Sequence, residues 1–181
     1  SMDPCESVIY MNTFSKTLTP AIRISYMVLP LHLLKKYQES CSFYSTTVSK
    51  IQQEVLREFI RGGYFGRHLN KMRGIYKNKH DFLVGELKKK NWVENIAGDN
   101  AGLHVLVQVN TTLTEEEICK KAAECGIRLM GIREHYIHTP PEGRPVLLLG
   151  YGKPDEQEIQ KGLEVLESII TGRNSNNCKK P

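Results

Sequence analysis

The sequence lacks several features that would assign it to a specialised class of protein. Its longest nearly apolar run, Ile24 to Leu34, is interrupted by Ser25, Pro30 and His32. That run is far shorter than the about 20 apolar residues that a membrane-spanning helix needs. The chain does not open with a basic segment followed by an apolar one, as a secretory signal would, and it contains no internal repeat. We therefore expect no membrane-spanning helix and no solenoid.

Cysteine is scarce and shows no motif. The five cysteines are odd in number and include no Cys-x-x-Cys pair: Cys5, Cys41, Cys119, Cys125 and Cys178. Structural metal sites and dithiol redox centres usually need such closely spaced pairs. We therefore expect no metal site, a reduced set of thiols and a cytoplasmic protein.

The remaining composition is typical of a globular protein. The 181 residues are 40% hydrophobic and 25% charged, and this length suffices for one large domain or two small ones. The formal net charge of +5 is too small to favour a particular partner.

The most informative segment presents Lys16 between two apolar stretches. A predicted buried strand, Val8 to Met11, leads into a hydroxyl-rich loop, and Arg23 precedes a second apolar strand. A lysine amine attacks aldehydes when desolvation or a nearby cation lowers its pKa. Hydroxyls and an arginine form a cradle for a phosphate. Aldehyde plus phosphate describes pyridoxal 5'-phosphate (PLP), although a solvated surface lysine remains the alternative.

A family resemblance favours the PLP interpretation. Residues 13–23, Thr-Phe-Ser-Lys-Thr-Leu-Thr-Pro-Ala-Ile-Arg, resemble the cofactor-lysine segment of fold-type I, PLP-dependent aminotransferases. They resemble in particular the aminotransferase-like domain of MocR-type transcription regulators of the GntR family. The resemblance implies that Lys16 holds PLP as a Schiff base in the full-length protein, and that Thr13 and Arg23, with Ser15 as a further candidate, contact the phosphate. We expect the isolated fragment to bind PLP weakly or not at all and to be inactive. The family often has glycine where this sequence has Ser25.

Helical patterns follow the lysine segment. A short helical turn is predicted over Leu31 to Tyr37, an amphipathic helix over Thr46 to Arg61, and a long helix from about Phe65 to Lys89. One face of the long helix is basic, with Arg67, Lys71, Arg73, Lys77, Lys79 and residues 88–90. We interpret this face as solvated, with lysines suited to the helix C-terminus; a nucleic-acid footprint is the alternative.

The remaining sequence predicts a small α/β unit. Alternating residues indicate a half-buried strand over Leu103 to Val109. Capping boxes at Thr114 and Asp155 predict two helices, which end at Gly126 and Gly172. Two short apolar strands are predicted over Ile127 to Met130 and Val146 to Leu149, and residues 174–181 form a polar tail.

The same family resemblance extends along nearly the whole chain. Further landmarks follow in the family's order, including His68-Leu-x-x-Met72-Arg73 and Leu149-Gly150-Tyr151. We therefore predict an α/β fold, the C-terminal small domain of a fold-type I PLP-dependent aminotransferase plus the end of its large domain. The predicted parts are a large-domain remnant with the lysine loop (1–38), connecting helices (39–90), the small domain (91–172) and the tail (173–181).

One position departs from the aminotransferase pattern. The family usually holds a substrate carboxylate with an arginine on a late strand, in a pattern like Leu-Arg-Leu-Gly-Phe, where this sequence has Leu148 instead. Leucine cannot make the bidentate contact of a guanidinium. Arg144 is the candidate replacement, and an exposed loop arginine is its alternative interpretation. His104 receives no role.

The resemblance implies the C-terminal part of a longer protein that carries a DNA-binding domain elsewhere. We expect an effector-sensing domain that responds to an amine or amino acid, binds DNA through the missing domain and forms a homodimer. A fragment of a genuine aminotransferase, with Lys16 as the base, is the alternative. A third option is a folding or dimerisation unit that exposes apolar residues around 8–11 and 24–29.

Overall fold

The computed structural model describes residues 3, 5–98, 102–139 and 142–172. The chain divides into two compact units, Ser1–Met72 and Arg73–Pro181. The predicted tail, 173–181, lies outside the described residues.

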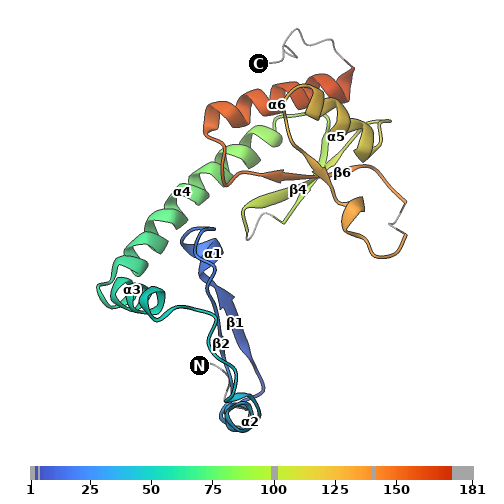
Figure 1. Cartoon of the computed structure of the whole chain (residues 1–181). Coiled ribbons are helices and arrows are strands. Elements are labelled where there is room, and N and C mark those ends of the chain that lie inside the picture. Colours follow the sequence, from blue (N-terminus) through green and yellow to red (C-terminus); the bar gives the residue numbers. More distant parts are fainter. Residues whose placement is uncertain (1–2, 4, 99–101, 140–141, 173–181) are drawn as a thin grey trace. The chain divides into compact units, whose positions relative to one another are not determined.

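The first unit is built on a two-stranded antiparallel ribbon. Strand β1 (Tyr10–Thr13) pairs with β2 (Ser25–Val28), and the one-turn helix α1 (Phe14–Thr17) directly follows β1. Helices α2 (Leu31–Cys41) and α3 (Lys50–Arg61) follow, and α4 (Tyr64–Leu87) begins in this unit (Figure 1). The ribbon therefore brings the two ends of the lysine loop side by side.

Two helices of this unit differ in length from the sequence prediction. Helix α2 continues to Cys41 instead of ending at Tyr37, because Gln38 and Glu39 are good helix formers. Helix α3 begins at Lys50 instead of Thr46, because the Ser49 hydroxyl caps it by accepting a hydrogen bond from the Gln52 N–H at 3.2 Å.

The first unit buries very little of its apolar surface. Among its described residues, only Phe14 and Pro30 are buried. Tyr10 is 65% exposed and Met11 is 75% exposed. The prediction of a buried strand over Val8 to Met11 is therefore wrong, because a two-stranded ribbon has no layer on either side to cover its side chains. The exposed apolar surface that was predicted around 8–11 and 24–29 is present.

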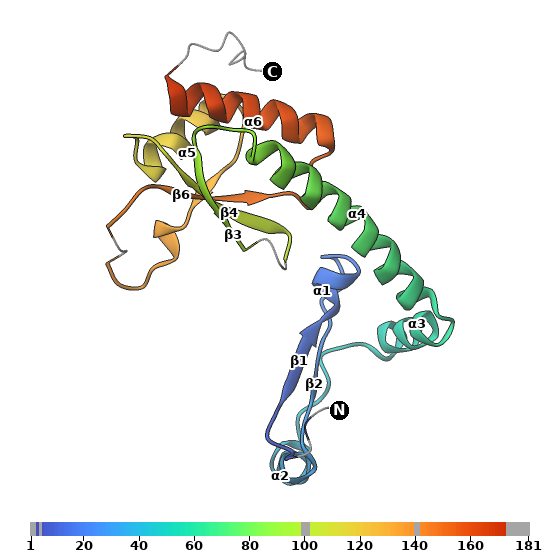
Figure 2. The ribbon, with the colours of Figure 1, turned by 180° about the vertical axis from the view of Figure 1, so that it is seen from behind.

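The second unit is a four-stranded antiparallel sheet covered by helices. Its strands are β3 (Val93–Ala97), β4 (His104–Val109), β5 (Met130–Gly131) and β6 (Val146–Gly150), arranged in the order β3-β4-β6-β5. Helices α5 (Glu115–Glu124) and α6 (Glu156–Thr171) lie side by side on one face of the sheet (Figure 2). A short 3-10 helix, Arg133–His135, follows β5.

A continuous apolar core holds this second unit together. Alternate residues of β4 and β6 point into it and meet side chains from α5, α6 and the end of α4. Both predicted capping boxes form, at Thr114 and Asp155, and Gly172 ends α6 with a φ of 68°. The largest of its fully buried side chains are Leu87, Val105, Val107, Val109, Ile118 and Leu147.

Two strands of this sheet differ from the prediction. Strand β3 was not predicted, because its sequence, Val-Glu-Asn-Ile-Ala, has no regular alternation of apolar and polar residues. Strand β5 begins at Met130 rather than Ile127. The N–H of Ile127 donates to the Ala122 carbonyl at 2.8 Å and so continues the end of α5.

The basic face of α4 is mostly solvent-exposed, as predicted. Three of its lysines have partners. Lys79 donates to the carbonyls of Gly152 and Lys153, Lys90 pairs with Glu167 at 2.7 Å, and the exposed Lys89 pairs with Glu86. The others that were predicted on this face, including Lys71 and Lys77, are exposed. These contacts account for the two lysines that are partly buried.

Among the residues that the structure describes, no helix is long and apolar enough to cross a membrane. No cluster of three or more histidine, cysteine or acidic side chains suited to a metal ion occurs among them either. Cys5, Cys41 and Cys119 are free thiols.

Candidate functional site

The predicted cofactor lysine lies on a single helical turn between the two strands of the ribbon. Thr13 ends β1 and caps α1, because its hydroxyl accepts a hydrogen bond from the Ser15 N–H at 3.2 Å. The Leu18 N–H closes the turn by donating to the Phe14 carbonyl at 2.8 Å. The Lys16 side chain is exposed and belongs to the last turn of α1.

The ribbon brings the four predicted cofactor residues into one region. Thr13 lies opposite Ser25 in the strand register, so the chain returns beside the lysine turn two residues after Arg23. Arg23 Nη1 lies 3.4 Å from Ser15 Oγ and donates to it. The Ser15 hydroxyl donates in turn to the Ile22 carbonyl, and the Thr13 hydroxyl donates to the Ile24 carbonyl at 3.2 Å.

The donors of this region match the chemistry of an aldehyde that carries a phosphate. A guanidinium offers several N–H donors to phosphate oxygens, and each hydroxyl offers one O–H. The amine of Lys16, on the same turn as Ser15, is the one nucleophile of the set. The hydroxyls now donate to backbone carbonyls, so each must rotate before it can donate to a phosphate. The residues present therefore fit PLP.

Aromatic packing anchors the lysine turn. The Phe14 ring is 9% exposed. It lies 5.3 Å from the Tyr26 ring and 5.7 Å from the Phe65 ring, between ring centroids. The contact with Phe65 is edge-to-face, an arrangement that aromatic pairs prefer. This contact could not be predicted from the sequence, because no local pattern in residues 13–23 indicates that residue 65 lies nearby.

A histidine of α4 also contacts the lysine turn. His68 Nε2 lies 3.1 Å from the Thr17 carbonyl oxygen. His68 had been recognised only as a sequence landmark, without a role. The sequence did indicate that Phe65 and His68 lie on the same face of a helix, because they are three residues apart. It did not indicate what that face contacts.

The proposed replacement for the substrate-binding arginine is engaged elsewhere in the second unit. Arg144 Nη1 lies 3.2 Å from Glu94 Oε2, and both side chains are more than 40% exposed. Leu148, where the family has arginine, pairs with Leu106 and Met130 in the sheet. A substrate carboxylate would therefore compete with Glu94 for the Nη1 donor of this guanidinium.

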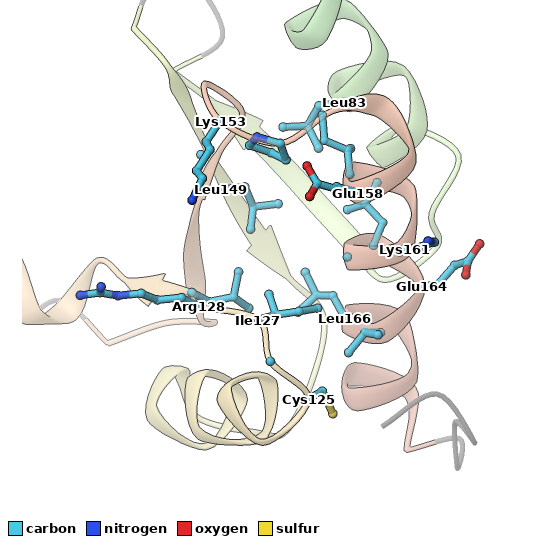
Figure 3. A pocket seen from close by; sticks show the side chains of 18 residues that line it. Leu83, Cys125, Ile127, Arg128, Leu149, Lys153, Glu158, Lys161, Glu164 and Leu166 are labelled. Atoms are coloured by element: carbon cyan, nitrogen blue, oxygen red, sulfur yellow. The ribbon is translucent and has the colours of Figure 1, made fainter. Parts of the chain in front are cut away.

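Two cavities of the second unit contain none of the predicted cofactor residues. One cavity of about 820 Å3 lies between α6 and the segment before β5. The side chains of Ile127, Leu149 and Leu166 point into this space, whereas that of Glu164 points away from it (Figure 3). The cavity is mainly apolar, although Arg128, Lys153 and Lys161 also line it.

A second cavity, of about 880 Å3, includes Arg144 together with Glu115 and Cys119. Burial raises the pKa of the Cys119 thiol, and the carboxylates of Glu134 and Glu115 raise it further. This thiol is therefore less nucleophilic than an ordinary one. We consequently place the candidate site at Lys16.

The fold is that of PLP-dependent aminotransferases. The alpha-aminoadipate aminotransferase LysN from Thermus thermophilus, solved with N-(5'-phosphopyridoxyl)-L-leucine, has a TM-score of 0.74 at 22% identity. The match covers 91% of this chain and 42% of that one. The family model for aminotransferase class I and II matches residues 1–160, so the chain belongs to that family.

Transcription regulators are among the curated relatives. The chain is 37% identical over 168 residues to the uncharacterized HTH-type transcriptional regulator YdeL of Bacillus subtilis, which covers 92% of this chain. It is 29% identical over 171 residues to the probable rhizopine catabolism regulatory protein MocR of Rhizobium meliloti, which covers 93% of it. The chain spans 36% and 34% of these two relatives, respectively, about a third of their lengths. The predicted resemblance to MocR-type regulators and the predicted fold class are confirmed.

Proposed function

We propose that this chain is the cofactor-holding part of a PLP-dependent, aminotransferase-like transcription regulator. The observation that carries the proposal is the grouping of Thr13, Ser15, Lys16 and Arg23 around one helical turn, with the guanidinium of Arg23 3.4 Å from the Ser15 hydroxyl. Membership of the aminotransferase family and the similarity to HTH-type regulators support it.

Each residue of the group has a separate task. When bound, PLP supplies an aldehyde carbon that accepts a nucleophile and a ring that withdraws electrons. The Lys16 amine would hold the group covalently through this carbon, with the aldehyde oxygen leaving as water. Arg23 holds the phosphate through charge-assisted hydrogen bonds, and the hydroxyls of Thr13 and Ser15 add directional donors.

Reductive labelling tests this assignment. The intact gene product is incubated with PLP, reduced with borohydride and digested, and the labelled peptide is located by mass spectrometry. We expect the label on Lys16, its loss in Lys16→Ala, and no change in Lys36→Ala, which removes an exposed lysine of α2. Arg23→Ala should raise the PLP concentration needed for half-maximal labelling by about tenfold or more, because hydrogen bonds to charged groups contribute about 1.5–3 kcal/mol. A label on another lysine contradicts the proposal.

The proposal includes the partners of the whole protein. An amine or amino-acid effector would compete with Lys16 for the cofactor aldehyde, and another part of the protein would bind DNA, as the HTH-type names of the relatives suggest. The exposed apolar residues of the first unit support a homodimer. A cytoplasmic location agrees with this role.

A genuine aminotransferase is the second candidate function, favoured by the fold and the family. In that reaction Lys16 would also carry a proton as general base. The presence of Leu148 and the pairing of Arg144 with Glu94 argue against ordinary recognition of a substrate carboxylate. Absorbance spectra of the intact protein with a panel of amines and amino acids distinguish the two. Turnover of many α-amino acids favours the enzyme, whereas a spectral change without turnover favours the sensor.

A further inference from the structure

Helix α4 contacts the lysine turn on both sides of Lys16. Two residues before the lysine, Phe14 packs edge-to-face against Phe65 at 5.7 Å. One residue after the lysine, the Thr17 carbonyl lies 3.1 Å from His68 Nε2. Phe65 and His68 are three residues apart and therefore share one face of the helix. All of these residues lie within the first unit.

The short helix α1 needs such external anchors. It has four residues and one completed turn, and the nucleation of a helix is unfavourable when so few hydrogen bonds repay the ordered backbone. The carbonyls at the end of a helix also lack partners inside it. The Phe14 carbonyl accepts from the Leu18 N–H, whereas the Thr17 carbonyl accepts from His68.

The chemistry of this contact identifies the donor. A carbonyl oxygen can only accept a hydrogen bond, so Nε2 of His68 must carry the hydrogen. An imidazole protonated at Nε2 donates in its neutral form as well as in its charged form. His68 is therefore the donor and the Thr17 carbonyl the acceptor of this contact.

We propose that His68 is a positioning residue that orients the Lys16 amine by anchoring the Thr17 carbonyl, while Phe65 fixes the other end of the same turn. This inference rests on the proposed function of Lys16. His68 itself does not touch the reacting atoms. Its loss would leave the Thr17 end of the turn free to move, so the amine would adopt the reactive orientation less often.

A pair of substitutions isolates the hydrogen bond. His68→Leu removes the donor and keeps an apolar side chain of intermediate size, whereas His68→Gln keeps an N–H donor. His138→Leu is the matched control, because His138 is exposed in the second unit. Urea unfolding of each variant verifies that the chain still folds.

Hydrogen exchange of the peptide that contains residues 14–18 is the first readout, and it needs no cofactor. We expect about fivefold faster exchange in His68→Leu, the size of effect that the loss of one neutral hydrogen bond produces. His68→Gln should restore most of the protection, and the control should match the unsubstituted chain. Equal exchange in all variants would overturn the proposal.

The rate of reductive PLP labelling at Lys16 in the intact protein is the second readout. We expect about fivefold slower labelling in His68→Leu and recovery in His68→Gln. Normal labelling of Lys16 in His68→Leu would refute the positioning role while leaving the proposed function intact. Labelling of the unsubstituted protein at another lysine would refute the proposed function. The exchange experiment would still test whether the hydrogen bond between His68 and the Thr17 carbonyl orders the turn. Slow labelling in both His68 variants would also count against the hydrogen bond.

Discussion

The two units of this chain differ in how far they bury their apolar side chains. The second unit buries large side chains from α4, α5 and two strands completely in one core, among them Leu87, Ile118 and Leu147. The first unit has apolar residues of the same kinds, yet Met11 is 75% exposed and Val55 is 65% exposed. Both units form regular helices and strands, so local structure does not explain the difference.

The difference lies in the number of layers that each unit contains. A four-stranded sheet under two helices can enclose a core. A two-stranded ribbon with short helices cannot, and isolated hairpins are at best marginally stable. The first unit nevertheless contains the candidate cofactor residues. The ordering of its lysine turn therefore depends on a few specific contacts rather than on a large core.

Truncation of a core residue should affect the second unit far more than the first. Leu87 is 0% exposed, so Leu87→Ala should lower the free energy of unfolding by about 2–5 kcal/mol. Val55→Ala in α3 should change it by less than about 0.5 kcal/mol, because that side chain is already in water. Urea unfolding measures both. A similar loss from both substitutions would show that the contrast in burial does not correspond to stability.

A buried carboxylate provides the next largest test. Glu115 is 6% exposed, and its two oxygens accept hydrogen bonds from the backbone N–H groups of Arg133 and Val146, each at 2.9 Å. Glu115→Ala would leave these two donors without their partner, at a cost of about 2–4 kcal/mol in the free energy of unfolding.

The neighbouring residue supplies the control for this test. Glu116 is exposed on the same turn of α5, and Glu116→Ala should change stability by less than about 0.5 kcal/mol. Equal losses of unfolding free energy in Glu115→Ala and Glu116→Ala would mean that the loss comes from the negative charge at the helix N-terminus and not from the buried hydrogen bonds.

Much of the second unit could be predicted from local sequence. Alternation identified β4, and the side chains of Thr114 and Asp155 identified the beginnings of α5 and α6, because these signals act within a few residues. Strand β3 could not be predicted, since it exists through its pairing with β4. The burial of Glu115 was also hidden, because its partners are 18 and 31 residues away.

The candidate site was only partly predictable. The grouping of Lys16 with Arg23 was suggested by their closeness in the sequence and by the family resemblance. The contacts of Phe14 with Phe65 and of Thr17 with His68 span 51 residues each, and no local pattern encodes them. The exposure of residues Val8 to Met11 likewise depends on the number of layers in the first unit. The alternation of apolar and polar residues along a strand does not predict that number.

Self-association should depend on the ribbon of the first unit. Met11 and Met27 are direct partners in the register of β1 and β2, and both are exposed. Met11→Glu with Met27→Lys keeps an attractive cross-strand pair while removing apolar surface. We expect the dissociation constant of any oligomer to rise about tenfold, as the loss of about one buried apolar side chain would produce. Light scattering over a dilution series measures it.

The matched control for self-association is in the second unit. Ile137 is 95% exposed, and Ile137→Lys should leave the dissociation constant unchanged if the ribbon is the interface. A monodisperse monomer before any substitution, or an equal effect of Ile137→Lys, would contradict the expectation.

Removal of a helix cap should produce the smallest loss of stability, and this loss should be confined to the second unit. The Asp155 carboxylate accepts a hydrogen bond from the Glu158 N–H at 2.8 Å, and Glu158 accepts one from the Asp155 N–H at 2.9 Å. Asp155→Ala should lower the free energy of unfolding by about 1 kcal/mol, whereas Asp155→Asn retains a cap and should lose much less. Because α6 contributes Ile159 and Leu163 to the core, loosening its first turn should speed hydrogen exchange in α6 and leave residues 14–18 unchanged. Faster exchange at the lysine turn in Asp155→Ala would mean that the ordering of this turn depends on the stability of the second unit. That result would contradict the inference that local contacts within the first unit order the turn.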